Sequence, residues 1–242
     1  MKLLIKDLWT SKVDWDETPP LLIQERWSQI VSELPVLNTL KIPRHLSIQI
    51  HSSVSLVGFC DASERAMGAC VYVHVVHPDN STHVHLACAK SKVAPMKHVT
   101  IPRLELCAAL LLSQLLLVVT EIFAARYDIR NIFCFTDSTV ALSWIISEPF
   151  KWNTFVANRV SKIQEVVHQD NWYHVQGVEN PADVLSRGTS PSELVGNSLY
   201  WNGPPWVKQP TDQWELSRKP QANIPDHVKP TKLSTSRLSS IS

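Results

Sequence analysis

The sequence has few cysteines, and none of them shows the spacing of a metal site. Its 242 residues include five cysteines, an odd number with no Cys-x-x-Cys pair. Cys60, Cys107 and Cys134 lie in apolar runs, where a free cysteine behaves as a small core residue. This usage argues against a disulfide-stabilised secreted domain and predicts a reducing, intracellular location, with the cytoplasm as the expected compartment.

The chain also lacks an excess of either charge and a long hydrophobic run. It has 23 basic and 22 acidic residues and a net charge of +1, so net charge neither indicates nor excludes a nucleic-acid partner. Charged residues within the first ten positions leave no apolar segment of the kind that a signal peptide needs. The longest apolar run, Leu110–Val119, is broken by Ser113 and Gln114 and is too short to span a bilayer. We therefore expect a soluble globular protein with no membrane partner.

Both ends of the chain differ in composition from its centre. Residues 1–50 are rich in Trp, Leu and Pro, and apolar residues at helical spacing predict one amphipathic helix over Leu21–Leu34. We interpret this segment as the end of a preceding domain. After Trp206 the sequence turns to Lys, Pro, Ser, Thr and Gln, a composition that predicts a linker or a disordered tail without core residues.

The central residues, 53–190, alternate between strand-like and helix-like segments. Apolar runs bounded by turn residues predict five strands: Val54–Cys60, Gly68–Val76, His83–Ala89, Ile132–Thr136 and Trp172–Val175. Helical spacing predicts Arg103–Arg126, Thr139–Ile146, Asn153–His168 and a short final helix opened by Pro181. The expected buried stripe of the first helix is Leu104, Ala108, Leu111, Leu115, Val118 and Ile122. This order predicts an α/β fold, a five-stranded mixed sheet flanked by helices.

Four acidic residues stand at the ends of these elements. Asp61 and Asp137 each follow an apolar strand, whereas Glu105 and Asp183 each lie in the first turn of a helix. Each alone has an ordinary explanation, because acids cap helices and complement their dipoles. Four together would repel one another unless cations neutralise them, and carboxylate oxygens select Mg²⁺ or Mn²⁺. The pattern predicts a two-ion site for phosphodiester hydrolysis, provided that the Asp61 and Asp137 strands are neighbours.

Histidine and tryptophan pairs offer weaker candidates for function. His83 and His85 point to one face of a strand, a spacing that zinc can use, but no cysteine or acidic partner accompanies them. Trp144 and Trp152 could stack on nucleic acid, although core positions are the more usual place for such residues.

Basic and polar residues near the acids also admit two interpretations. Arg103 and the Lys90–Lys92 segment could contact phosphates, although a solvated surface is the simpler explanation. Ser138 is expected to cap the helix that follows it. Arg187 could pair with a nearby carboxylate or reach a phosphate, and the sequence does not choose between them.

Four sequence blocks resemble the ribonuclease H domain of Bel/Pao-type retrotransposons. They are Phe59–Ser63 (FCDAS), Arg103–Ala109 (RLELCAA), Thr136–Ser138 (TDS) and Asn180–Gly188 (NPADVLSRG). The resemblance implies the ribonuclease H-like fold and cleavage of the RNA strand of RNA–DNA hybrids. It also implies that Asp61 bridges two Mg²⁺ or Mn²⁺ ions, that Glu105 and Asp137 complete one side, and that Asp183 completes the second ion's shell.

The same resemblance implies a place between reverse transcriptase and integrase in one polyprotein, whose other parts would be partners. Residues 1–50 would be the end of the reverse transcriptase thumb or connection region, 53–190 the ribonuclease H-like domain, and 191–242 a largely disordered linker toward integrase.

Two departures from related enzymes keep a second interpretation open. Many relatives carry a histidine after the glycine that follows the last strand, whereas here Gly177 precedes Val178 and the nearest histidine, His174, lies inside the strand. A basic segment for binding the hybrid, often called a basic handle, is also lacking. Lys151 is the only basic residue between the second and third predicted helices. The alternative to an active nuclease is therefore a catalytically inactive nucleic-acid-binding or connection module.

Overall fold

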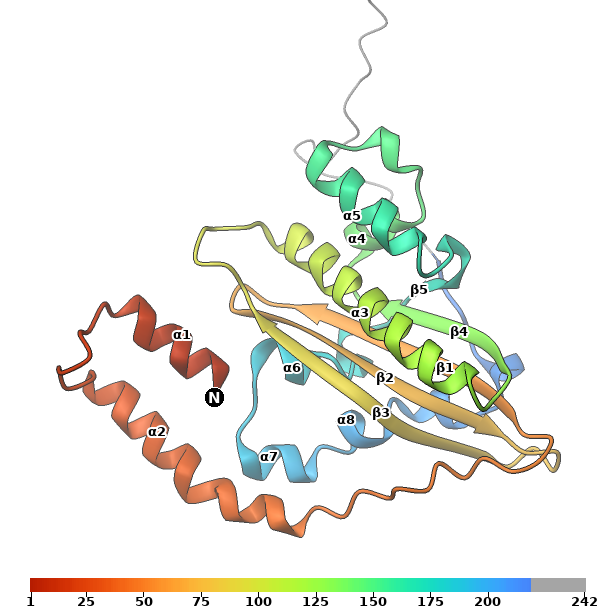
Figure 1. Ribbon diagram of the computed structural model, residues 1–242, viewed down its shortest axis with the longest axis horizontal. Helices are drawn as coiled ribbons and strands as arrows, with labels where there is room; N and C mark the ends of the chain where they lie inside the picture. Colours follow the sequence, from red (N-terminus) through yellow and green to blue (C-terminus); the bar gives the residue numbers. More distant parts are fainter. Residues whose placement is uncertain (219–242) are drawn as a thin grey trace, which may run out of the picture.

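The computed structural model describes residues 1–218 (Figure 1). Its strands are β1 (Ser53–Ala62), β2 (Ala66–Val76), β3 (Thr82–Val93), β4 (Ile129–Thr136) and β5 (Trp172–His174). Its α-helices are α1 (Lys2–Thr10), α2 (Leu21–Glu33), α3 (Ile101–Ala124), α4 (Thr139–Ile145), α5 (Thr154–Gln164), α6 (Asp183–Arg187), α7 (Pro191–Gly196) and α8 (Ser198–Asn202). The predicted strands and helices are all present, and α7 and α8 follow the short helix that we expected to be the last. β3 runs past the predicted Ala89 because its polar end continues to pair with β2 as far as Val93.

The sheet has the strand order β3-β2-β1-β4-β5 and is mixed, as predicted. β1 pairs antiparallel with β2 and parallel with β4, so β1 is the central strand of the sheet and the apolar strand β4 lies beside it. In the parallel pair Cys60 is opposite Thr136. The next residues, Asp61 and Asp137, therefore leave the same edge of the sheet, which confirms that their strands are neighbours.

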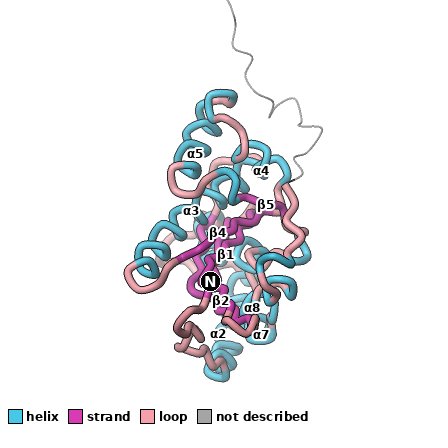
Figure 2. The backbone as a smooth tube through the Cα atoms, turned by 90° about the vertical axis from the view of Figure 1, so that its right-hand side faces the viewer, coloured by secondary structure: helices cyan, strands magenta, loops and turns pink. Residues whose placement is uncertain are grey.

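Two hydrophobic clusters cover the two faces of the sheet. Along β1, Leu56 and Cys60 belong to the cluster beneath α3, whereas Val57 and Phe59 belong to the cluster on the opposite face. Side chains alternate between faces along a strand, and a strand buried on both faces is therefore apolar throughout. Figures 1 and 2 show α3, α4 and α5 on one side of the sheet and α6, α7 and α8 on the other.

The second half of helix α3 is buried on a different face from the one predicted. The first half of the expected stripe is correct, but Val118 is 52% exposed and Ile122 is 62% exposed. The second half instead buries Leu112, Leu116 and Val119. The sheet covers one flank along the helix, whereas α5 covers the other flank only beside the first turns, near Arg103 and Cys107. By length and composition α3 could also cross a membrane, as many core helices of soluble proteins could.

The segment after Trp206 contributes to the core, so the expectation of a linker without core residues is wrong for residues 207–218. Val207 is fully buried and Trp214 is 7% exposed, and both pack against the cluster that contains Phe59 and Phe135. The polar composition of this segment conceals the two apolar anchors, and the aromatic face of the sheet offers them a surface. The remainder of the expected disordered tail, residues 219–242, lies outside the described residues.

The N-terminal segment contacts the central domain through α1. Leu4 is buried, Lys2 Nζ donates to the backbone oxygen of Ser91 at 2.8 Å, and Arg65 pairs with Asp7 at 2.6 Å. The helix predicted over Leu21–Leu34 is confirmed as α2, but none of its residues is buried. Residues 1–50 are thus attached at two places: α1 lies against β3 and the β1–β2 turn, and the 3-10 helix Leu34–Thr39 contacts α7. The apolar side chains of α2 are left largely in solvent.

Candidate metal centre

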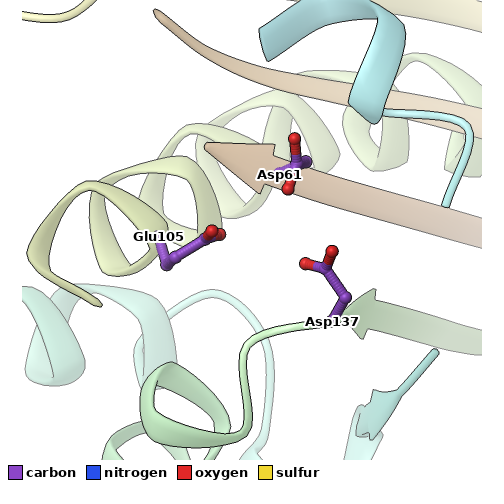
Figure 3. A group of neighbouring side chains, drawn as sticks. All are labelled: Asp61, Glu105 and Asp137. Atoms are coloured by element: carbon purple, nitrogen blue, oxygen red, sulfur yellow. The ribbon is translucent and has the colours of Figure 1, made fainter. Parts of the chain in front are cut away.

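Three carboxylates converge at the edge of the sheet where β1 and β4 end (Figure 3). Asp61 comes from β1, Asp137 follows β4, and Glu105 comes from the beginning of α3. One oxygen atom of each lies within 4.8 Å of the others. A single cation placed between them could bind all three side chains.

The local sequence accounts for this convergence. Parallel neighbours β1 and β4 end at the same edge, so the residue after each strand's last apolar positions is brought there. β3 runs back to that edge, and α3 begins next to it, with Pro102 in its first turn. Leucines on the same turns of α3 hold the helix on the sheet, so Glu105 is held beside the strand ends.

Burial makes the charged forms of these acids costly. Asp61 is 3% exposed and Glu105 is 7% exposed. Burial, together with the neighbouring charges of Asp137 and Asp183, raises the pKa of Asp61 to about 6. The pKa of Glu105 rises to about 9 through burial, and then through the charges of Asp61 and Asp137. Burial also raises the pKa of Asp137. A bound cation would reverse this penalty, because it stabilises the ionised form of each acid.

Two carboxylate oxygens in the cluster have no protein partner. Glu105 Oε2 and Asp137 Oδ1 are inaccessible to solvent and form no hydrogen bond with any described residue. Buried polar atoms are nearly always satisfied, so these two oxygens suggest a ligand that accepts their lone pairs. Hard oxygen donors suit Mg²⁺ or Mn²⁺, and the donor set therefore fits the ions that the sequence predicts.

Asp183, the fourth predicted acid, lies beside this cluster and does not belong to it. It is the first residue of α6, its side chain is 41% exposed, and it forms an ion pair with Arg187 one turn later. Its charge nevertheless raises the pKa of both Asp61 and Asp137. Asp183 therefore acts on these two acids electrostatically, although its ligand atoms lie outside the group formed by Asp61, Glu105 and Asp137. Arg187 pairs with a carboxylate, one of the two possibilities that the sequence left open.

Helix α6 is held against the end of β1 by residues that sequence reasoning did not select. Ser186, fully buried, donates a hydrogen bond to Asp61 Oδ2, and Asn180 Nδ2 donates to the backbone oxygen of Cys60 at 3.0 Å. A Cβ on Gly68 of β2 would lie 2.2 Å from Leu185 Cβ, so only glycine permits this approach. The sequence signal that could have indicated Asn180 and Ser186 was their place in the Asn180–Gly188 block, which resembles the family motif.

Ser186→Ala should weaken divalent metal binding about tenfold, because partners that orient a metal ligand typically contribute 10- to 100-fold to affinity. The hydrogen bond from Ser186 lowers the pKa of Asp61, so its loss leaves more of that acid protonated at neutral pH. Calorimetric titration with Mn²⁺ measures the change. Ser32→Ala, an exposed serine on α2, is the control, and equal affinities of the two variants would contradict this role.

The remaining candidates occupy structural positions. The Ser138 side chain accepts a hydrogen bond from the backbone N–H of Ala141 and caps α4, as predicted. Trp144 is 1% exposed and Trp152 is 7% exposed, so both belong to the core. His174 lies at the end of β5 with its Nε2 3.2 Å from the backbone oxygen of Asp137. Its ring therefore borders the acidic cluster through the backbone, which the sequence did not indicate.

The rings of His83 and His85 lie parallel, with centroids 6.4 Å apart. His77 lies on the other side of His83, at a centroid distance of 5.0 Å. Among residues 1–218, the three carboxylates described above are the one group of three or more histidine, cysteine or acidic residues whose ligand atoms lie close enough for a shared metal ion. The weak zinc hypothesis for this histidine pair gains no support.

Comparison with known proteins gives one family and several solved structures. A family model described as a Pao retrotransposon-like RNaseH-like domain matches residues 1–138, and no curated protein matches. The chain is similar to RNase H1 of the archaeon Halobacterium salinarum, with 16% identity over 56% of this chain and 95% of that one, at a TM-score of 0.35.

Two further structures show a similar level of likeness. One is the N-terminal RNase H domain of a Mycobacterium tuberculosis protein, with 14% identity over 60% of this chain and 99% of that one, at a TM-score of 0.35. The other is LC11-RNase H1 in complex with an RNA/DNA hybrid, with 14% identity, 58% and 99% coverage, and a TM-score of 0.35.

Proposed function

Because this chain belongs to the family of Pao retrotransposon-like RNaseH-like domains, we propose that it hydrolyses the RNA strand of RNA–DNA hybrids with two Mg²⁺ or Mn²⁺ ions. The observation that carries the proposal is the convergence of Asp61, Glu105 and Asp137 within 4.8 Å at the sheet edge. Two of their oxygens are buried without a hydrogen-bond partner among residues 1–218. A cluster that serves only the fold has no need of such unpartnered oxygens.

Each acid has a proposed role in holding the ions. Asp61 belongs to the clustered acids, and on the basis of the family resemblance we assign it to both ions. Glu105 and Asp137 complete the buried site, and Asp183 serves the exposed one after its carboxylate leaves Arg187. Ions bound there would supply an activated water and stabilisation of the leaving oxygen. The products would carry 3′-hydroxyl and 5′-phosphate ends.

The test is cleavage of an end-labelled RNA–DNA hybrid by the full chain with Mg²⁺ or Mn²⁺. Double-stranded DNA and double-stranded RNA serve as substrate controls, and EDTA serves as the metal control. We expect metal-dependent cuts in the RNA strand of the hybrid alone. Hybrid binding by folded protein without any cleavage would support the inactive-module interpretation and would overturn our proposal.

We propose the polyprotein context on the basis of the family alone. Residues 1–50 would then be the end of the reverse transcriptase thumb or connection region, and the chain after residue 190 would lead toward integrase. The attachment of α1 to β3, through Lys2 and Ser91, supports a fixed orientation between that N-terminal segment and the nuclease domain. Limited proteolysis tests this: cleavage before residue 53 should leave the N-terminal fragment bound to the remainder.

A further inference from the structure

Two arginines from different helices share one aromatic ring next to the beginning of α3, the helix that also carries Glu105. The guanidinium carbon of Arg159 lies 3.5 Å from the centre of the Phe155 ring, and that of Arg103 lies 5.0 Å from the same centre. Arg103 belongs to the first turn of α3, two residues before Glu105, whereas Phe155 and Arg159 belong to α5. We call these three residues the arginine pair and its ring.

The position of Arg159 is fixed by several contacts. Its Nη1 donates to the backbone oxygen of Phe155 at 2.9 Å, and its Nε lies 3.3 Å from the Cys107 sulfur. Stacking on an aromatic face adds a favourable cation–π interaction. The guanidinium is therefore oriented before any ligand arrives, which lowers the entropic cost of binding one.

Neither arginine of the pair is neutralised by a carboxylate. Within residues 1–218, the ion pairs formed by arginine use Arg26, Arg65, Arg187 and Arg218. Arg103 also donates no side-chain hydrogen bond to any described residue, although both arginines are only partly exposed. Two like charges held on one ring repel each other, and an anion placed between them would relieve that repulsion.

The placement of the pair determines which anion it fits. The first turn of α3 presents Glu105 to the acidic cluster and Arg103 to the seam with α5. A polyanion cleaved at the cluster would pass its adjoining phosphates over this seam. We propose that Arg103 and Arg159 bind backbone phosphates of the nucleic acid next to the cleavage centre, an inference that rests on the proposed function. Guanidinium groups suit this task because their donors match phosphate oxygens.

This surface also supplies a pair of basic residues, whereas the sequence offered only Arg103 of the two and did not connect it with Arg159. The expected handle carried only Lys151, which lies in a short 3-10 turn, Pro149–Lys151, and is exposed. Arg103 and Arg159 lie 56 positions apart in the chain and come together only through the packing of α5 on α3. The phosphate contact proposed here therefore requires the tertiary fold.

The test is the affinity of the full chain for a fluorescent RNA–DNA hybrid, measured by anisotropy in EDTA over a series of salt concentrations. We expect Arg103→Gln and Arg159→Gln each to weaken binding about tenfold and to reduce the slope of log K against log salt by about 0.9. Arg130→Gln is the matched control, because Arg130 is exposed at the opposite end of β4 from Asp137. Unchanged affinity and slope in both variants, or equal losses in the control, would overturn the proposal.

A lysine variant separates a loss of binding from a loss of the fold. Arg159→Lys keeps the charge but loses the planar stacking surface, so it should retain the salt slope while binding a fewfold more weakly. Thermal unfolding of every variant confirms that it is folded. If the glutamine variants lose binding while the parent protein does not cleave, this inference stands and the proposed function fails. If the parent cleaves and the variants bind normally, only this inference fails.

Discussion

Replacing Asp61 with asparagine is expected to lower the rate of hybrid cleavage at least about a thousandfold while leaving the fold intact. The amide keeps the shape of the side chain but removes the charge that we assign to both ions, and the stabilisation those ions supply amounts to several kcal/mol. Asp61 is the most buried of the three clustered acids, so solvent cannot replace its role. Single-turnover cleavage of labelled hybrid with Mg²⁺ measures the loss.

The control is Asp128→Asn, because Asp128 is an exposed acid directly before β4, at the other end of the strand from Asp137. It should cleave at the parent rate, and Asp137→Asn should behave like Asp61→Asn. Hybrid binding should be retained in both site variants, since they remove negative charge from a surface that faces a polyanion. Cleavage that survives both substitutions would show that these acids do not form the active centre.

The metal-free protein is expected to lose stability as pH rises from 5 to 8. Burial and the neighbouring Asp61 and Asp137 charges raise the pKa of Glu105 to about 9, well above the value of about 4.5 in an unfolded chain. The folded state therefore binds more protons than the unfolded state between these values, and the free energy of unfolding falls as pH increases. The contribution of Glu105 to the free energy of unfolding is fully present below pH 4.5 and is lost progressively toward pH 9. We expect a fall of about 2 kcal/mol or more in urea unfolding with EDTA.

Glu105→Gln tests the origin of that slope. The glutamine does not ionise, so the variant should be more stable than the parent at pH 8 in EDTA, and its stability should change less with pH. Mg²⁺ should stabilise the parent at pH 8 but have a weaker effect on the variant, because binding to the folded state alone shifts the unfolding equilibrium. Identical pH slopes in the two proteins would contradict the assignment of this shift to Glu105.

The local chemistry of the strands made the centre of the fold predictable. The segments Val54–Cys60 and Ile132–Thr136 are almost entirely apolar, with Ser55 and Thr136 as their polar residues, and such a composition is typical of a strand buried on both faces. An acid directly after such a strand is conspicuous, so Asp61 and Asp137 could be selected from the sequence, with Glu105 added by its place in a leucine-rich helix. Ser138 could be identified as a cap because a cap depends on residues only a few positions away.

Other features depend on residues far apart in the chain. Val207 and Trp214 lie in a polar segment, and nothing nearby indicates that the aromatic face of the sheet would bury them. The exposed second half of the α3 stripe has the same cause, since periodicity shows that a helix has an apolar face but not how far α5 extends along it.

From the sequence alone, cysteine usage and near-neutral charge limited the class of protein. Two strand ends and the beginning of one helix identified three acids of the candidate site. Tertiary structure decided that these acids lie within 4.8 Å of one another, that Asp183 stands beside them paired with Arg187, and that Ser186 orients Asp61. It also decided that Arg103 and Arg159 meet on one ring. The physical reason is range: capping, periodicity and burial patterns act over a few residues, whereas distances, pKa shifts and unpaired charges depend on which distant segments pack together.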